Sequence, residues 1–198
     1  AQTLLKAIQS GAVKASVLNA SQIQFLRKHK NKGVSETAAS VLGVQTASPR
    51  QEVLATFKPA LALRGDAARG RKIYLERCVS CHRAEDQGFA LGPDLVAVKA
   101  NGKEKLLDGV IDPNREVDPR YLAYLVETKA GESLVGVITS ETAASIAVRQ
   151  PFGKEDTVLR GDLRRMQSVG QSLMPEGLEA GLTPPQMADL IEFIETLK

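Results

Sequence analysis

Cys78-Val79-Ser80-Cys81-His82 is the stretch of this sequence that decides the fold, because it places three reactive side chains within five residues. The two residues between the cysteines let both sulfurs reach one edge of a porphyrin, where each thiol can add to a vinyl group. The histidine that follows can turn its imidazole under the iron. The spacing therefore predicts one covalent haem c, bonded to Cys78 and Cys81, with His82 as the proximal ligand.

Two other chemistries use closely spaced cysteines, and the sequence argues against both. A structural zinc site takes four ligands, whereas the motif offers three and the chain holds one further histidine, His29, in a lysine-rich stretch. A thioredoxin-like redox pair follows a strand in a βαβ unit, but residues 70–77, before Cys78, have helical spacing. Because both cysteines of the chain lie in the motif, none remains for a disulfide.

The composition is that of an ordinary globular chain. Its 198 residues are 43% hydrophobic, 25% charged and 4% aromatic, and the formal net charge is +3. Without a basic run interleaved with aromatic residues, no nucleic-acid surface is predicted. No apolar run reaches about 18 residues, so no membrane span is predicted.

The motif also bears on localisation. Haem attachment of this kind takes place outside the bacterial cytoplasm, so we expect a periplasmic or otherwise exported protein. Residues 1–5 lack the basic start and apolar core of a signal peptide. We therefore expect that a signal has been removed or that the chain is a fragment of a longer exported polypeptide.

The chain divides into two parts by its patterns. Residues 1–43 have helical spacing and residues 44–50 are polar with a proline, which together predict a repeat-like helical extension and a linker over 1–50. The extension is either the tail of a longer solenoid or a helical segment packed on the haem domain. Residues 51–198 are predicted to form the haem domain.

Within the haem domain the pattern changes from helical to β-rich and back. Helices are predicted from Asp66 to the motif, over Lys103–Ile111, and from Thr183 onward. Short segments rich in β-branched and aromatic residues, separated by turn signals, lie between them: Tyr121–Thr128, Ser133–Thr139, Ala144–Arg149, Asp156–Leu159 and Leu163–Ser168. They predict an antiparallel meander of four or five strands.

Haem iron bound to one histidine needs a second axial ligand, and the chain offers few. His29 lies in a charged stretch that indicates a solvated loop, and Met187 lies on the apolar face of the last helix. Met166 lies in a strand, as core or surface. Met174 precedes Pro175, which stiffens its loop, and a thioether on a stiff loop suits iron. We predict Met174 as the distal ligand, with Met166 and His29 as alternatives.

The order of these features resembles that of class I c-type cytochromes. In that family a helix with Gly-x-x-x-aromatic precedes C-x-x-C-H, and a Gly-Pro-x-Leu loop, a Met-Pro loop and a final helix with an aromatic residue follow. The matching positions here are Gly70 and Tyr74, Cys78–His82, Gly92–Leu95, Met174–Pro175 and Phe193. The resemblance implies that Phe193 on the last helix crosses the first helix near Gly70.

The resemblance also implies cofactor contacts that the motif alone does not assign. The carbonyl of Pro93 is expected to accept a hydrogen bond from Nδ1–H of His82. Leu95 is expected to pack on the haem, and Tyr74 to belong to the cofactor-binding residues.

One departure from the family pattern is large. His82 and Met174 are 92 residues apart, and removing residues 119–169 leaves a chain of minimal cytochrome length. The fold is therefore predicted as a mainly α cytochrome c fold with a small inserted antiparallel β-sheet, α+β overall, and an N-terminal helical extension. The haem core is predicted over 67–118 and 170–198.

A narrower resemblance concerns the whole chain. Residues 65–70, 92–95, 112–114 and 172–177 and the strand block look like the haem-binding domain at the C-terminal end of large exported bacterial multidomain proteins. Those proteins carry a dehydrogenase-like module and helical repeats, and residues 1–43 are similar to the last repeat. This implies a dehydrogenase module as electron source and a respiratory cytochrome or oxidase as sink.

One-electron transfer is the leading functional hypothesis, which makes the chain an electron-transfer module and not itself an enzyme. His/Met ligation leaves no open iron site and raises the reduction potential. The alternatives are a haem-based gas sensor or a peroxidase-like enzyme with a displaceable distal ligand, and a docking module with a structural haem. The sequence does not indicate an oligomeric state.

Overall fold

The computed structural model describes residues 1–13, 15, 18, 20–42 and 50–198. The linker predicted over residues 44–50 falls outside the described residues, apart from Arg50. Three helices lie at the N-terminal end: α1 (Gln2–Gln9), α2 (Ala20–Arg27) and α3 (Lys32–Val41). They share a small apolar core of Leu5, Leu26, Val34 and Ala38. The described part of residues 1–43 is therefore helical, as predicted.

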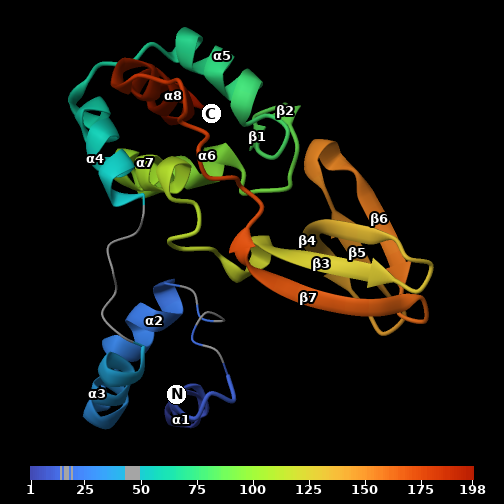
Figure 1. The fold of residues 1–198 in the computed structure, drawn as a ribbon. Helices are drawn as coiled ribbons and strands as arrows, with labels where there is room; N and C mark the ends of the chain where they lie inside the picture. The colour runs from blue at the N-terminus through green and yellow to red at the C-terminus, as the bar shows by residue number, and fades with distance from the viewer. Residues whose placement is uncertain (14, 16–17, 19, 43–49) are drawn as a thin grey trace.

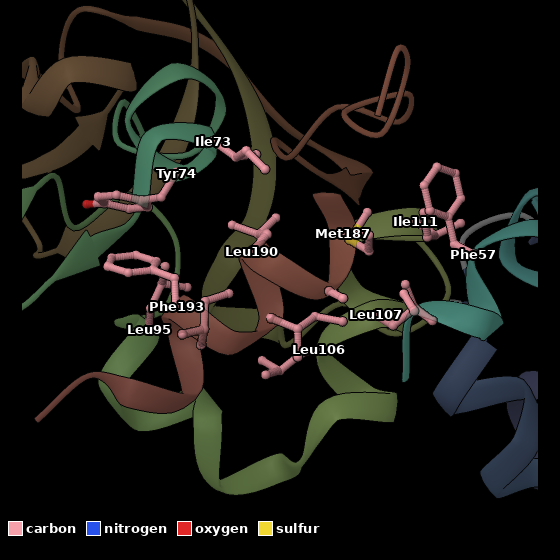
Figure 2. Packing of buried hydrophobic residues seen from close by; sticks show 14 of the residues in the cluster. Phe57, Ile73, Tyr74, Leu95, Leu106, Leu107, Ile111, Met187, Leu190 and Phe193 are labelled. Carbon is pink, nitrogen blue, oxygen red and sulfur yellow. The ribbon is translucent and has the colours of Figure 1, made fainter. Parts of the chain in front are cut away.

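Residues 50–198 contain more helix than strand (Figure 1). The helices are α4 (Gln51–Phe57), α5 (Ala67–Arg77), α6 (Leu95–Val98), α7 (Lys103–Ile111) and α8 (Pro184–Thr196), with 3-10 turns η2 (Lys58–Ala62), η3 (Lys99–Asn101) and η4 (Pro119–Tyr121). Their apolar faces meet in one core, in which Tyr74, Leu107, Ile111 and Met187 are almost fully buried (Figure 2). Met187 is thus a core residue, as its helical face predicted.

Helices α5 and α8 cross at Gly70. A Cβ atom at Gly70 would lie 1.9 Å from the carbonyl oxygen of Asp189 and 2.8 Å from Cβ of Phe193, so only glycine lets the backbones approach this closely. Next to the crossing the rings of Tyr74 and Phe193 lie with centroids 5.3 Å apart (Figure 2). The crossing expected from the cytochrome resemblance is therefore present.

A buried carboxylate ties the start of α5 to α8. Asp189 is 3% exposed, and it accepts hydrogen bonds from Nε and Nη2 of Arg69 at 2.7 and 2.8 Å and from the backbone N–H of Asp66 at 2.7 Å. Asp66 is also the N-cap of α5, where its side chain accepts from the backbone of Arg69. These bonds fix the register in which α5 lies on α8.

The strand block forms a five-stranded antiparallel sheet. Its strands are β3 (Leu122–Thr128), β4 (Ser133–Glu141), β5 (Ser145–Arg149), β6 (Glu155–Leu159) and β7 (Leu163–Ser172), in the order β6-β5-β4-β3-β7. The prediction of a simple meander was wrong for the last strand, because β7 pairs with β3 and not with β6. Strand β7 also runs four residues past the predicted end at Ser168.

The connection between β6 and β7 shows that this sheet is curled. Only residues 160–162 join two strands at opposite edges. Across a flat sheet of five strands the edges would lie about 19 Å apart, whereas the four chain steps from Leu159 to Leu163 span at most about 14 Å. The curled sheet encloses its own core of Val126, Ile146, Val148 and Val158, against which Met166 packs.

The sheet stands beside the helical part, with the turn between β5 and β6 near a two-residue hairpin that follows His82 (Figure 1). This hairpin pairs β1 (Arg83–Ala84) with β2 (Gln87–Gly88). The chain enters the sheet at Leu122 and leaves it at Ser172, and these two residues are paired. Both connections to the helical part therefore leave from one end of the sheet.

Candidate functional site

The C-x-x-C-H stretch forms a tight turn at the end of α5. The backbone N–H of Cys78 donates to the carbonyl of Tyr74 at 2.8 Å, which continues the helix to the first cysteine. The N–H groups of Cys81 and His82 then donate to the carbonyl of Cys78, at 3.0 and 2.9 Å. Both thiols are free and half-buried. The turn thus brings two thiols and an imidazole together without a disulfide.

The Cys78 thiol lacks the character of a redox-active cysteine. Burial, and then the neighbouring Cys81, raise the pKa of the Cys78 thiol to about 11. Redox-active cysteines instead have pKa values below that of a free thiol.

The His82 imidazole is held by the loop that follows the motif. Its Nδ1 lies 2.8 Å from the carbonyl oxygen of Pro93, so in the tautomer that donates this bond Nε2 keeps its lone pair. A Cβ atom at Gly92 would lie 2.5 Å from Cε1 of His82, so glycine allows the loop to approach the ring. Burial lowers the pKa of His82, against a smaller opposing effect of the Pro93 carbonyl. The residue is therefore neutral, as a metal ligand requires.

The Tyr74 hydroxyl joins the end of the C-x-x-C-H turn to the hairpin that follows it. Its hydroxyl lies 2.9 Å from the carbonyl oxygen of His82 and 3.1 Å from that of Gln87, and burial raises its pKa, so the hydroxyl stays protonated and donates. Tyr74 and Leu95 both lie in the helical core. Neither is among the described residues that line the neighbouring cavity, so their contact with a haem stays a prediction.

A cavity of about 620 Å³ opens beside the turn. Its walls include Cys81, His82, Leu91, Pro93, Val98, Gly109, Pro113, Val117, Leu173 and Met174. Cavities of about 300–1,000 Å³ with mostly apolar walls and a few polar groups are typical of cofactor sites. An attachable thiol, a neutral imidazole and a thioether line one cavity, so the residues present fit a haem.

One side-chain amide spans the loop that carries Met174. The Oδ1 of Asn114 accepts from the backbone N–H of Ser172 at 3.0 Å, and its Nδ2 donates to Oε1 of Glu176 at 2.7 Å. The hydroxyl oxygen of Ser172 in turn accepts from the N–H of Met174 at 3.0 Å. The narrower resemblance included residues 112–114, but nothing in the sequence indicated that Asn114 bonds the Met174 loop, because its partners lie about 60 residues away.

The segment after this loop is fixed to the helical part by two arginines. Arg77 Nη1 donates to the carbonyls of Leu178 and Ala180 at 2.6 and 2.7 Å. Arg50, at the start of α4, pairs with the buried Glu179 and donates from Nε to the carbonyl of Ile111 at 2.9 Å. Both ends of the Met174 loop are therefore anchored.

The alternative distal ligands lie elsewhere. Met166 packs against the core of the sheet, and Met187 is buried in the helical core. His29 follows α2, where its Nδ1 accepts from the N–H of Asn31 at 3.0 Å and its ring contacts Phe25. Of the three methionines, Met174 alone lines the cavity among the residues that the structure describes.

In the described part of the chain, no helix has the length and apolar character needed to cross a membrane.

No curated protein matches the chain. The family model for cytochrome c matches residues 67–121, which run from α5 to η4 and include Cys78, Cys81 and His82. This match supports a c-type cytochrome domain with covalently bound haem, and haem-based electron transfer in general.

Proposed function

We propose that this chain is an electron-transfer module, not itself an enzyme, in which one haem is bonded to Cys78 and Cys81 and ligated by His82 and Met174. The observation that carries the proposal is the shared cavity, which His82 and Met174 line beside Cys81. When bound, the haem supplies an iron that takes up and releases one electron. Each of the chain's own residues then has a physical task.

On the proximal side, the Pro93 carbonyl orients the His82 ring and increases its basicity through the Nδ1 bond. Met174 would offer the iron a soft sulfur, which would favour its reduced state and raise the potential. The anchored loop keeps that sulfur in one place in both oxidation states. The apolar walls exclude water, which lowers the local dielectric around the ring.

We further propose the wider architecture. Residues 51–198 form the cytochrome domain, with its haem core at 67–118 and 170–198 and the sheet as an insertion at 119–169, and residues 1–50 form the extension. The protein is exported to the periplasm or beyond, as covalent haem attachment requires. The narrower resemblance supports a dehydrogenase module on the same polypeptide as electron source, with a respiratory cytochrome or oxidase as acceptor.

The optical spectrum of the oxidised holoprotein tests the ligand pair. A weak red charge-transfer band reports a bond between methionine sulfur and iron, and we expect it in the wild type. Met174→Ala should abolish this band, lower the reduction potential and let external ligands reach the iron. Met166→Ala is the matched control and should leave the band intact. If the band survives Met174→Ala, Met166 or His29 becomes the candidate.

The same variant tests the gas-sensor and peroxidase-like alternatives, which need an open or displaceable distal position. Carbon monoxide should bind the reduced wild type poorly and Met174→Ala readily. Tight binding to the wild type would favour the sensor hypothesis.

Covalent attachment is tested separately. Haem should stay with the chain through acid–acetone extraction, and Cys78→Ser or Cys81→Ser should leave one thioether or no holoprotein. Loss of haem from the wild type would contradict the thioether assignment.

A further inference from the structure

Two aromatic rings lie exposed beside the haem-attachment turn. Phe152 is 69% exposed and Phe89 37% exposed, and their centroids lie 6.1 Å apart in an edge-to-face arrangement. Phe89 directly follows β2, whereas Phe152 lies in the turn η5 (Pro151–Gly153) between β5 and β6. The helical part and the sheet therefore contribute one ring each to this aromatic pair.

Backbone contacts place the aromatic pair at the attachment turn. The N–H of Phe152 donates to the carbonyl of Ser80 at 2.8 Å, and Ser80 directly precedes Cys81. Nearby, Arg149 Nη1 donates to the carbonyl of Ala90 at 3.0 Å. The turn that carries Phe152 is therefore hydrogen-bonded to the residue next to Cys81, to which a haem would be attached.

The backbone is strained where it presents Phe152. This residue has φ 62° and ψ 23°, in the left-handed region that bulky side chains rarely adopt. This conformation is unfavourable for a phenylalanine, and a ring that remains mostly exposed recovers little of that cost by burial. A Cβ atom at Gly153 would lie 2.7 Å from the Phe89 ring, so glycine is needed for the pair to form. Strain of this kind concentrates at functional sites.

The segments that carry the two rings hold charges of both signs, most of them in ion pairs, while Glu85 and Asp86 in the turn between β1 and β2 make no ion pair among the described residues. The ion pairs are Arg83–Asp94 at 2.8 Å, Arg149–Glu155 at 2.7 Å and Lys154–Asp156 at 3.1 Å. Steering of a charged partner needs a patch dominated by one sign of charge. Paired charges around exposed aromatic rings instead suit a partner whose docking face is apolar and uncharged.

We propose that Phe89 and Phe152 form a docking surface for a redox protein whose own redox centre is surrounded by uncharged, apolar side chains. This inference rests on the proposed electron-transfer function. Such complexes are transient and bury little area, and aromatic side chains carry much of their binding energy. The sheet thereby supplies half of the surface through which electrons leave or enter beside Cys81.

A second copy of the holoprotein has the required chemistry, so electron self-exchange between its reduced and oxidised forms is the probe. NMR of mixed-oxidation samples gives the rate. We expect it to change less than about twofold between roughly 20 mM and 500 mM salt, because charge steering contributes little. Phe152→Gly and Phe89→Ser should each lower the rate about 5- to 10-fold, the effect of losing a central aromatic contact.

The choice of variants separates docking from folding. Phe152→Gly removes the ring while glycine keeps the positive φ without strain, so the turn should persist. Phe25→Ser is the matched control, because Phe25 is 66% exposed on α2. The control should leave self-exchange unchanged, and all variants should keep the wild-type reduction potential and red band.

Unchanged rates in both Phe152→Gly and Phe89→Ser, or rates that depend strongly on salt, would overturn the docking surface while leaving the electron-transfer proposal standing. An oxidised wild type without methionine ligation would instead contradict the proposed ligand pair. A wild type that does not exchange electrons at all would contradict the proposed function and the docking surface with it.

Discussion

Asn114 fixes the position of the Met174 loop by hydrogen bonds, as Pro93 fixes the His82 ring. The Pro93 carbonyl holds one imidazole, whereas the Asn114 amide joins Ser172 and Glu176, which lie on either side of Met174. Each such hydrogen bond contributes about 1 kcal/mol. Together they restrict the positions that the sulfur can reach, which strengthens any bond it makes to iron.

Asn114→Ala is expected to weaken methionine ligation without removing it. Loss of two hydrogen bonds, worth about 2 kcal/mol together, should make displacement of the sulfur by added imidazole roughly 30-fold more favourable. Titration of the oxidised holoprotein with imidazole, followed in the red band, measures this directly. Asn101→Ala, at another asparagine of the cavity wall, is the control and should match the wild type. Equal imidazole affinities for Asn114→Ala and wild type would show that the amide does not position Met174.

At the scale of elements, the contact between α5 and α8 positions the C-x-x-C-H turn, which follows α5. Cys78 is the C-cap of α5, so any shift of this helix moves the attachment turn. Close packing at Gly70 and the bonds of Asp189 to Arg69 and Asp66 hold the two helices in one register. Changes at this contact are therefore expected to affect stability before they affect the iron.

Gly70→Ala should separate the two helices. The added methyl would lie 1.9 Å from the Asp189 carbonyl oxygen, and overpacking of this kind costs about 1–3 kcal/mol. Urea unfolding of the holoprotein measures the loss. Gly33→Ala in α3 is the control, because its Cβ atom would meet its nearest neighbour at 3.4 Å and should change stability by less than about 1 kcal/mol. A fully stable Gly70→Ala would mean that the helices can move apart at no cost.

The Asp189 carboxylate predicts a pH dependence. The hydrogen bond from Arg69, followed by the bond from Asp66, keeps the pKa of Asp189 below its ordinary value despite burial. A carboxylate with a lowered folded pKa stabilises the fold fully above its unfolded pKa of about 3.9, and this contribution is lost as pH falls through the folded pKa. Asp189→Asn should therefore be less stable than wild type at neutral pH, and the difference should shrink below about pH 4. A constant difference across this range in urea unfolding would exclude the linkage.

At the scale of the whole molecule, residues 51–198 contain two hydrophobic cores that have no described residue in common. The helical core surrounds Tyr74 and Met187, and the sheet has its own core around Val126 and Ile146. Because β3 and β7 are paired where the chain enters and leaves, the sheet connects to the helical part much as a hairpin would. The separate cores support the proposal that the sheet is an insertion.

Replacing residues 122–171 with a short Gly/Ser linker tests that proposal. The variant keeps Asn114, Ser172 and Met174, so we expect a haem-loaded, low-spin protein with the wild-type red band. Its self-exchange rate should fall, since Phe152 is removed with the sheet. Optical spectra of the purified holoprotein measure the ligation, and urea-unfolding titrations measure the stability. A variant without methionine ligation would show that the sheet belongs to the haem core.

The sequence predicted the features that depend on residues close to one another in the chain. The C-x-x-C-H motif follows from spacing, whereas the Pro93 contact to His82 and the Gly70 crossing were implied by the resemblance to class I c-type cytochromes, and the structure has all three arrangements. The strands of the sheet were predicted because turn residues separate short β-rich segments. The helix starts at Asp66 and Thr183 were likewise predicted from their capping residues.

What sequence reasoning missed depends on residues that are distant in the chain. Asn114 bonds residues 58 and 62 positions away, and Asp189 meets Arg69 across 120 positions, so neither pair leaves a periodic signal. The place of β7 beside β3 depends on how the sheet curls, which strand propensities do not determine. The left-handed backbone conformation of Phe152 could not be predicted, because residues other than glycine seldom adopt it and nothing in the sequence marks the exception.

The pairing of Leu122 with Ser172 has a consequence for the order in which the molecule folds. Bringing His82 and Met174 together in an unfolded chain closes a loop of 92 residues, but a folded sheet shortens the effective loop to about 43 residues. Loop-closure entropy makes the shorter path more favourable by about 0.7 kcal/mol, or roughly threefold in rate if closure limits folding. The β3–β4, β4–β5 and β5–β6 pairs are local in sequence, and local contacts form early, whereas the pair of β3 with β7 is non-local and closes last. The sheet would then act as a kinetic aid to distal ligation, and capture of the iron by Met174 would follow the sheet's formation in refolding experiments.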